Sequence, residues 1–241
     1  MNQALTARQT QILKSLIDEY IDTAEPVGSL SLEKKYTLGI SPATIRNEMM
    51  NLTKMGYLQQ PHTSAGRIPT PIAMKFYISQ LMEEKQMSLA DEVKTKEEVW
   101  DSRNDIDLLL DEATQALADR TNNLAITTLE DGRTYKAGFK NVFESPEFSG
   151  DIIACAHIFE LLDEAQRIQE LFFHKLRGAT TIEVLFGEDL GWRNLTPISI
   201  VATQFTIGGK KGALGVIGPI RQPFPTIIPI VRYFHEMLES F

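Results

Sequence analysis

Residues 41–70, SPATIRNEMMNLTKMGYLQQPHTSAGRIPT, decide the fold of the first part of this 241-residue chain. Ser41 can cap a helix, and Pro42 fits its first position, where the missing N–H group costs no helical hydrogen bond. Gly56 is a typical residue at which a helix ends. The stretch therefore predicts a helix over 41–54 that stops before this glycine.

The predicted helix has two different faces. At about 100° per residue, Ile45, Met49 and Leu52 fall on one side, which we expect to be buried. The opposite side is polar, small or basic with a single apolar member, and it comprises Ala43, Arg46, Asn47, Met50, Asn51 and Lys54.

A hairpin is predicted after this helix. The segments 57–60 (YLQQ) and 67–69 (RIP) favour two short strands, which 61–66 (PHTSAG) joins. Thr70 and Pro71 then repeat the pattern of a capping residue followed by proline, so a further helix begins there.

The residues upstream complete the domain. Thr6 and Gln9 have the spacing of a capping box, and apolar residues recur at helical spacing behind them. The segment 25–29 (EPVGS) breaks this helix, and 30–36 favours a short second one. The order helix, helix, turn, helix, hairpin, helix predicts a winged helix-turn-helix domain over 1–83.

This fold suggests how the polar face could read DNA. A helix of about 10–12 Å diameter fits the major groove and presents its N-terminal residues to base edges. Arginine can fork onto guanine, asparagine onto adenine, and alanine can touch a thymine methyl group. An ordinary solvated charge is the alternative for Arg46. The predicted residues of the recognition helix are Ser41, Ala43, Thr44, Arg46, Asn47, Asn51 and Lys54.

The hairpin would form a DNA-facing wing. The hydroxyl groups of Thr63 and Ser64 and the amide of Gly66 can donate to phosphate, and Arg67 supplies positive charge. We expect Gly66 to take a positive φ, which would let the turn approach the DNA backbone closely. His62 is predicted to be a polar wing residue, since no second metal ligand is near it in sequence.

The acidic composition does not exclude this role. The net charge is −8, but residues 1–80 carry eight Lys and Arg against six Asp and Glu, and the acidic excess lies beyond them. Only nearby charge acts on a polyanion, because salt screens contributions beyond about 8–10 Å. Between residues 40 and 80, Glu48 is the one acidic residue.

The stretches 25–29 and 38–70 resemble the heat-inducible transcription repressor family (HrcA), with a match that runs over residues 4–83. The resemblance implies that 41–54 is the recognition helix and 60–68 the wing. It also implies a homodimer on an inverted-repeat operator in double-stranded DNA upstream of chaperone operons. A GroE-type chaperonin would modulate its activity.

The remaining chain predicts a second, α+β part. Residues 84–104 are rich in charge and favour a helical linker, for which pairing with a copy of itself is one possibility. Within 105–241, apolar runs predict strands at 123–129, 180–186, 198–207 and 212–220 among helices.

This second part also resembles the family. Residues 135–148 (YKAGFKNVFESPEF) and 212–238 are similar to segments of its GAF-like domain. A long central stretch of the family, which includes an inserted dimerisation domain, is missing. The resemblance therefore implies a shortened GAF-like regulatory or dimerisation domain.

No catalytic, cofactor or metal site is predicted. The segment 208–212 (GGKKG) lacks the remaining residues of a phosphate-binding loop and favours a hairpin turn. Cys155 and His157 fall in an apolar helix, where a lone cysteine usually acts as a small hydrophobic residue.

A single cysteine and the lack of a long apolar run are typical of a cytoplasmic protein that is not in the membrane.

Two other functions remain open at this stage. One is a winged-helix repressor whose second domain senses a small molecule. The other is a winged-helix module that binds proteins and has lost DNA binding. We do not expect an enzyme, because no nucleophile and base have an evident partner in the sequence.

Overall fold

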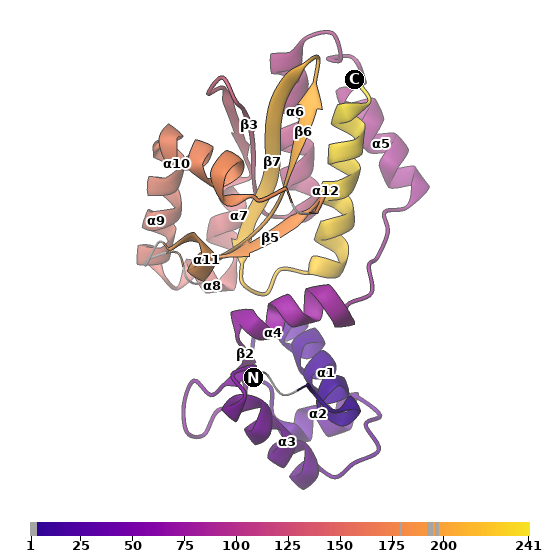
Figure 1. Ribbon diagram of the computed structural model, residues 1–241, viewed down its shortest axis with the longest axis vertical. Coiled ribbons are helices and arrows are strands. Elements are labelled where there is room, and N and C mark those ends of the chain that lie inside the picture. Colours follow the sequence, from indigo (N-terminus) through magenta and orange to yellow (C-terminus); the bar gives the residue numbers. More distant parts are fainter. Residues whose placement is uncertain (1–3, 179, 192–194, 196–197) are drawn as a thin grey trace. The chain divides into compact units, whose positions relative to one another are not determined.

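The computed structural model describes residues 4–178, 180–191, 195 and 198–241. The chain divides into two compact units, Met1–Glu83 and Glu84–Phe241 (Figure 1).

The first unit is a winged helix-turn-helix domain, as predicted. Its elements are α1 (Ala7–Thr23), α2 (Ser29–Lys35), α3 (Pro42–Lys54), β1 (Leu58–Gln59), β2 (Ile68–Pro69), α4 (Pro71–Phe76) and a π-helical turn (Tyr77–Leu81).

The predicted caps form in this unit. Thr6 and Gln9 make both hydrogen bonds of a capping box, and Ser41 and Thr70 each accept a backbone N–H of the helix that follows them. A longer-range bond joins the two ends of the unit, because the Tyr77 hydroxyl donates to Asp18 of α1 at 2.6 Å. Burial and this carboxylate hold the pKa of Tyr77 above its ordinary value, so the phenol stays protonated and remains a donor.

In the described part of the second unit there are five strands and most of the helices of the chain. Its elements are α5 (Leu89–Trp100), α6 (Ile106–Thr121), β3 (Leu124–Leu129), β4 (Thr134–Ala137), α7 (Phe139–Glu144), α8 (Pro146–Ser149), α9 (Ile152–Asp163), α10 (Ala165–Gln169), a π-helical turn (Glu170–Lys175), β5 (Glu183–Phe186), α11 (Gly187–Leu190), β6 (Ile198–Ile207), β7 (Lys210–Pro219) and α12 (Phe224–Glu239).

The strands form one antiparallel sheet in the order β4-β3-β7-β6-β5. Helices cover both faces, with α6 and α12 on one and α9 and α10 on the other (Figure 1). On the first face, Thr114 of α6 donates to Thr127 of β3 at 2.7 Å. On the second, Gln204 of β6 donates to the carbonyl of Phe172 at 2.8 Å. This α+β arrangement confirms the predicted fold class.

The structure differs from the sequence-based expectation at two places. Residues 84–104 are part of the second unit, because α5 buries Thr95 and Val99 and Tyr233 donates to the Glu92 carbonyl at 2.6 Å. The strand β4 has no clear signal in the sequence, since it is only four residues long and its side chains are mostly half-buried.

Among the described residues, no helix is long and apolar enough to cross a bilayer.

A buried polar cluster joins the start of β3 to the segment before α12. The side chain of Gln222 is fully buried and donates to the carbonyl and hydroxyl oxygens of Ser199 at 2.8 and 2.9 Å. Its own carbonyl oxygen accepts a bond from Asn123 at 3.3 Å. Each buried polar group is therefore satisfied by another, which is the condition for such a cluster to stabilise a core.

Replacement of Gln222 by alanine should lower the free energy of unfolding of the second unit by about 1–3 kcal/mol, because Asn123 and Ser199 lose a buried partner. Tryptophan fluorescence during urea unfolding measures this change, since both tryptophans lie beyond residue 84. Gln115→Ala is the matched control, because Gln115 is an exposed residue of α6. An equal loss in the two variants would contradict the role assigned to Gln222.

Candidate nucleic-acid interface

The exposed face of α3 is the polar face predicted from the sequence. Ile45, Met49 and Leu52 are buried in the first unit. Ser41 caps the helix, and its hydroxyl lies 3.0 Å from that of Thr44, so these two side chains already bond to each other. The exposed predicted residues are Ser41, Ala43, Arg46, Asn47, Asn51 and Lys54, while Thr44 is half-buried.

The one acidic residue of this helix is held by α1. The Glu48 carboxylate accepts hydrogen bonds from Gln9 at 3.1 Å and from Asn51 at 3.4 Å, and Arg8 lies 3.9 Å away. These partners reduce its repulsion of a polyanion. Arg46 and Asn47, by contrast, have no side-chain hydrogen bond or ion pair within the described part of the chain and can meet a ligand without losing an internal partner.

The wing loop is held by a residue that sequence reasoning missed. The side-chain amide of Gln60 donates to the carbonyl oxygens of Thr63 and Ala65 at 2.9 and 3.0 Å. Its position at the end of the first predicted strand is the only signal in the sequence, and it does not distinguish Gln60 from Gln59. With the loop closed in this way, His62, Thr63 and Ser64 lie exposed at its tip.

The wing is tied to the turn before α2. Backbone hydrogen bonds run from Val27 N–H to the Arg67 carbonyl at 2.9 Å and from Arg67 N–H to the Val27 carbonyl at 2.8 Å. The segment 25–29 thus adds an isolated β-bridge to the hairpin of β1 and β2.

This bridge explains Gly66 and corrects the expectation about it. Gly66 does not have a positive φ. A Cβ atom at this position would lie 2.4 Å from the Val27 carbonyl oxygen and 2.7 Å from the carbonyl carbon of Pro26. Glycine is required because another part of the chain approaches it, and the prediction of a left-handed turn here was wrong.

Arg67 links the wing to the end of α3. Its Nε–H donates to the Thr53 hydroxyl at 3.2 Å, and that hydroxyl in turn donates to the carbonyl of Met49 at 2.8 Å. The side chain is half-buried. Its charge therefore has a defined position at the base of the wing.

A cleft of about 510 Å³ brings the helix and the wing together. Of the predicted residues it is lined by Ala43, Arg46 and Asn47 of α3 and by Ser64, Gly66 and Arg67 of the wing. The start of α2 contributes further residues, namely Gly28, Ser29 and Leu30. The remaining predicted residues lie outside the cleft: Ser41, Thr44, Asn51, Lys54, His62 and Thr63.

Neither Cys155 nor His157 belongs to a metal site in the described residues, where no group of three or more His, Cys, Asp and Glu could hold an ion. The buried Cys155 thiol donates to the carbonyl of Phe148 at 3.2 Å. The His157 ring instead pairs with Glu160 at 2.8 Å.

Two models of known protein families match this chain. Residues 4–83 match the family model described as winged helix-turn-helix transcription repressor, HrcA DNA-binding, and residues 72–228 match HrcA protein C terminal domain. The chain belongs to the HrcA family. The first match contains all of α3 and the wing.

Relatives share both parts of this HrcA chain but are longer. The heat-inducible transcription repressor HrcA of Carboxydothermus hydrogenoformans is 26% identical over 334 aligned positions, which cover 97% of each chain. Because 334 positions exceed the 241 residues of this chain, at least 93 of them have no counterpart here. The HrcA of Desulfitobacterium hafniense is 35% identical over 193 positions, covering 73% of this chain and 55% of that protein.

A solved structure supports the fold. A crystal structure titled as a hypothetical protein aligns with a TM-score of 0.76 and 18% sequence identity, covering 98% of both chains. At this identity the likeness concerns the fold alone.

Replacement of Gly66 by alanine should destabilise the first unit by about 1–3 kcal/mol, because the new Cβ must push away the backbone at Val27. Circular dichroism during thermal unfolding measures the loss. Gly28→Ala is the matched control, since a Cβ there meets nothing within 4 Å and only a weak helix-capping preference is lost. Unchanged stability of the Gly66 variant would contradict the bridge as the reason for this glycine.

Proposed function

We propose that this HrcA-family chain represses transcription by binding an inverted-repeat operator with α3 and the wing of its first unit. The observation that carries the proposal is the shared cleft of α3 and wing, in which Arg46 and Asn47 have no internal hydrogen bond or ion pair to give up. The match of residues 4–83 to a DNA-binding repressor domain agrees with it.

The residues of the cleft divide into two roles. Arg46 and Asn47 would read guanine and adenine edges, and Ala43 would contact a thymine methyl group. Ser64 and the amide of Gly66 would donate to phosphate, with Arg67 adding charge at the base of the wing. Outside the cleft, Thr63, His62 and Lys54 would contact the flanking DNA backbone. Ser41 and Thr44 would hold the start of α3, and Asn51 would add to its DNA-binding face.

The operator would be read by two copies. An inverted repeat has two-fold symmetry, so a homodimer presents one recognition helix to each half-site, about 34–36 Å apart or a multiple of that distance. We further infer that the dimer acts on chaperone operons in the cytoplasm and that a GroE-type chaperonin modulates it. These statements rest on membership of the family.

Arg46→Ala and Asn47→Ala should each weaken binding to the operator by about 1–3 kcal/mol, because each would remove a base contact. Fluorescence anisotropy with operator and with scrambled duplex measures both affinities. Arg67→Ala should weaken both duplexes by a similar factor, since a phosphate contact carries no sequence information.

Lys14→Ala provides the control for charge, because it removes one positive charge from α1, outside the cleft. Its effect should be small on either duplex. A selective loss on the operator in the Arg67 variant would overturn its assignment to phosphate, and an equal loss on both duplexes in the Arg46 variant would overturn base reading by that side chain.

Operator affinity should fall steeply with salt. Each phosphate that is neutralised contributes about −0.9 to the slope of log K against log salt concentration on duplex DNA. Titrations at about 50 and 200 mM salt should therefore differ by a large factor if several phosphates are bound. Absent binding would favour a protein-interaction module instead, and salt-independent binding would contradict the proposed phosphate contacts.

A further inference from the structure

The helix α5 is attached to its own unit mainly by polar contacts. Of its twelve residues, only Thr95 and Val99 are buried. Glu98 pairs with Arg120 of α6 at 2.9 Å, and Tyr233 of α12 donates to the Glu92 carbonyl at 2.6 Å.

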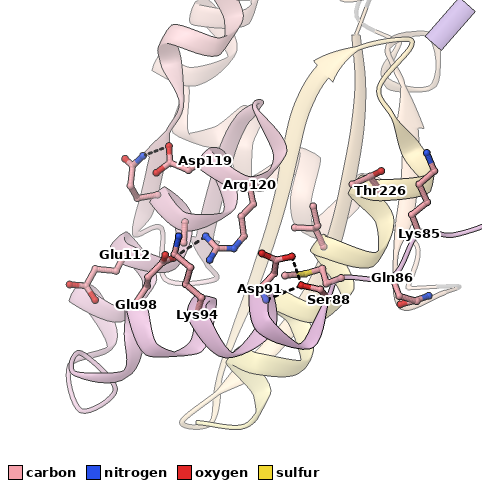
Figure 2. A pocket seen from close by; sticks show the side chains of 14 residues that line it. Lys85, Gln86, Ser88, Asp91, Lys94, Glu98, Glu112, Asp119, Arg120 and Thr226 are labelled. Atoms are coloured by element: carbon pink, nitrogen blue, oxygen red, sulfur yellow. Dashed lines mark hydrogen bonds and ion pairs between the residues drawn. The ribbon is translucent and has the colours of Figure 1, made fainter. Parts of the chain in front are cut away.

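A large cleft lies beside α5. It has a volume of about 900 Å³, and Figure 2 shows residues of α5 along one wall and residues of α6 along another. Many of its polar side chains bond to one another, in the pairs Ser88–Asp91, Glu98–Arg120 and Gln115–Asp119. The cleft therefore shows incomplete packing of α5 rather than a set of groups that await a ligand.

The outer face of α5 carries an apolar stripe. Leu89, Val93 and Trp100 are 76%, 49% and 44% exposed. Lys96 lies between Val93 and Trp100 on the same face. Successive members of this stripe are four, three and four positions apart, which is the spacing of a coiled-coil seam. The Lys96 ammonium lies 5.5 Å from the Trp100 ring and 5.9 Å from that of Phe241, so its aliphatic stem extends the apolar surface. The two rings are themselves 5.9 Å apart.

We propose that this stripe pairs with the same stripe of a second copy, with the two α5 helices antiparallel. A parallel pair would place Lys96 against its own counterpart, and like charges in one layer repel. In an antiparallel pair centred between residues 94 and 95, each Lys96 faces Val93 of the other copy, with Glu92 and Glu97 of that copy beside it. The charges are then complementary.

A second exposed apolar patch is less suited to self-pairing. It lies on α7 and α9, where Phe143 stacks on Phe159 with ring centroids 5.4 Å apart and Ile152 is 82% exposed. The exposed charged residues of these two helices and of the α9 cap are mostly acidic: Glu144, Asp151, Glu160 and Asp163, with Lys140 as the basic one. Two copies of this patch would bring like charges together.

The proposal rests on the homodimer of the proposed function and names its surface. The segment Glu84–Ser88 is all that separates α5 from the winged-helix unit. Pairing through α5 would therefore join two DNA-binding units close to where each of them ends. It would also supply a dimer contact in a chain that lacks at least 93 aligned positions of a longer relative.

Sedimentation equilibrium of the full chain tests the surface. Leu89→Ser with Val93→Ser should raise the dimer dissociation constant at least tenfold, and Lys96→Glu should raise it as well, because the new carboxylate would meet Glu92 and Glu97 of the other copy. Phe143→Ser with Ile152→Ser is the matched control and should leave the constant unchanged. All the replaced side chains are exposed, so the variants should fold. Circular dichroism verifies that they do.

A dimer that survives the α5 changes but dissociates in the control variant would overturn the proposed surface, as would a wild-type chain that stays monomeric at micromolar concentration. DNA binding is measured separately with a duplex that holds one half-site. The α5 variants should keep wild-type affinity for it. If the wild-type chain does not bind the half-site duplex, that result contradicts the proposed function, whatever the sedimentation result.

Discussion

The geometry of the candidate DNA-binding surface depends on the two backbone hydrogen bonds between Val27 and Arg67. They hold the turn before α2 against the second strand of the wing, and the close approach leaves room only for glycine at position 66. Since α2 also packs against α3, the wing and α3 take fixed positions relative to each other. The cleft between them follows from this arrangement.

The side chains around the cleft show a division between structure and recognition. Thr53 and Arg67 connect the end of α3 to the wing, Gln60 closes the wing loop, and the partners of Glu48 hold its charge beside α1. Arg46 and Asn47 have no such task within the first unit. A surface of this kind, with free polar side chains held on a hydrogen-bonded frame, would be preorganised for the proposed binding, which reduces the conformational entropy lost on association.

The parts of this structure that could be predicted from the sequence depend on neighbours along the chain. Helix caps at Ser41 and Thr70 and the two faces of α3 depend on residues three or four positions away, and each was predicted correctly. The reason for Gly66 could not be predicted, because it lies in the backbone of residues 26 and 27, about forty positions upstream. The placement of α5 in the second unit was missed for a related reason, since it includes a contact with Tyr233 of α12, about 140 positions downstream of Glu92. The roles of the individual residues of α3 and the wing in DNA binding stay predictions.

Photo-cross-linking to a labelled inverted-repeat operator tests the central claim most directly, that α3 and the wing are the surface that binds it. A photoreactive side chain in place of Met50, which is exposed on α3, or of Ser64 should cross-link to the operator, and one at position 160, exposed on α9, should not. Scrambled DNA should compete poorly with the reaction at position 50. Efficient cross-linking from position 160, with none from 50 and 64, would contradict the account.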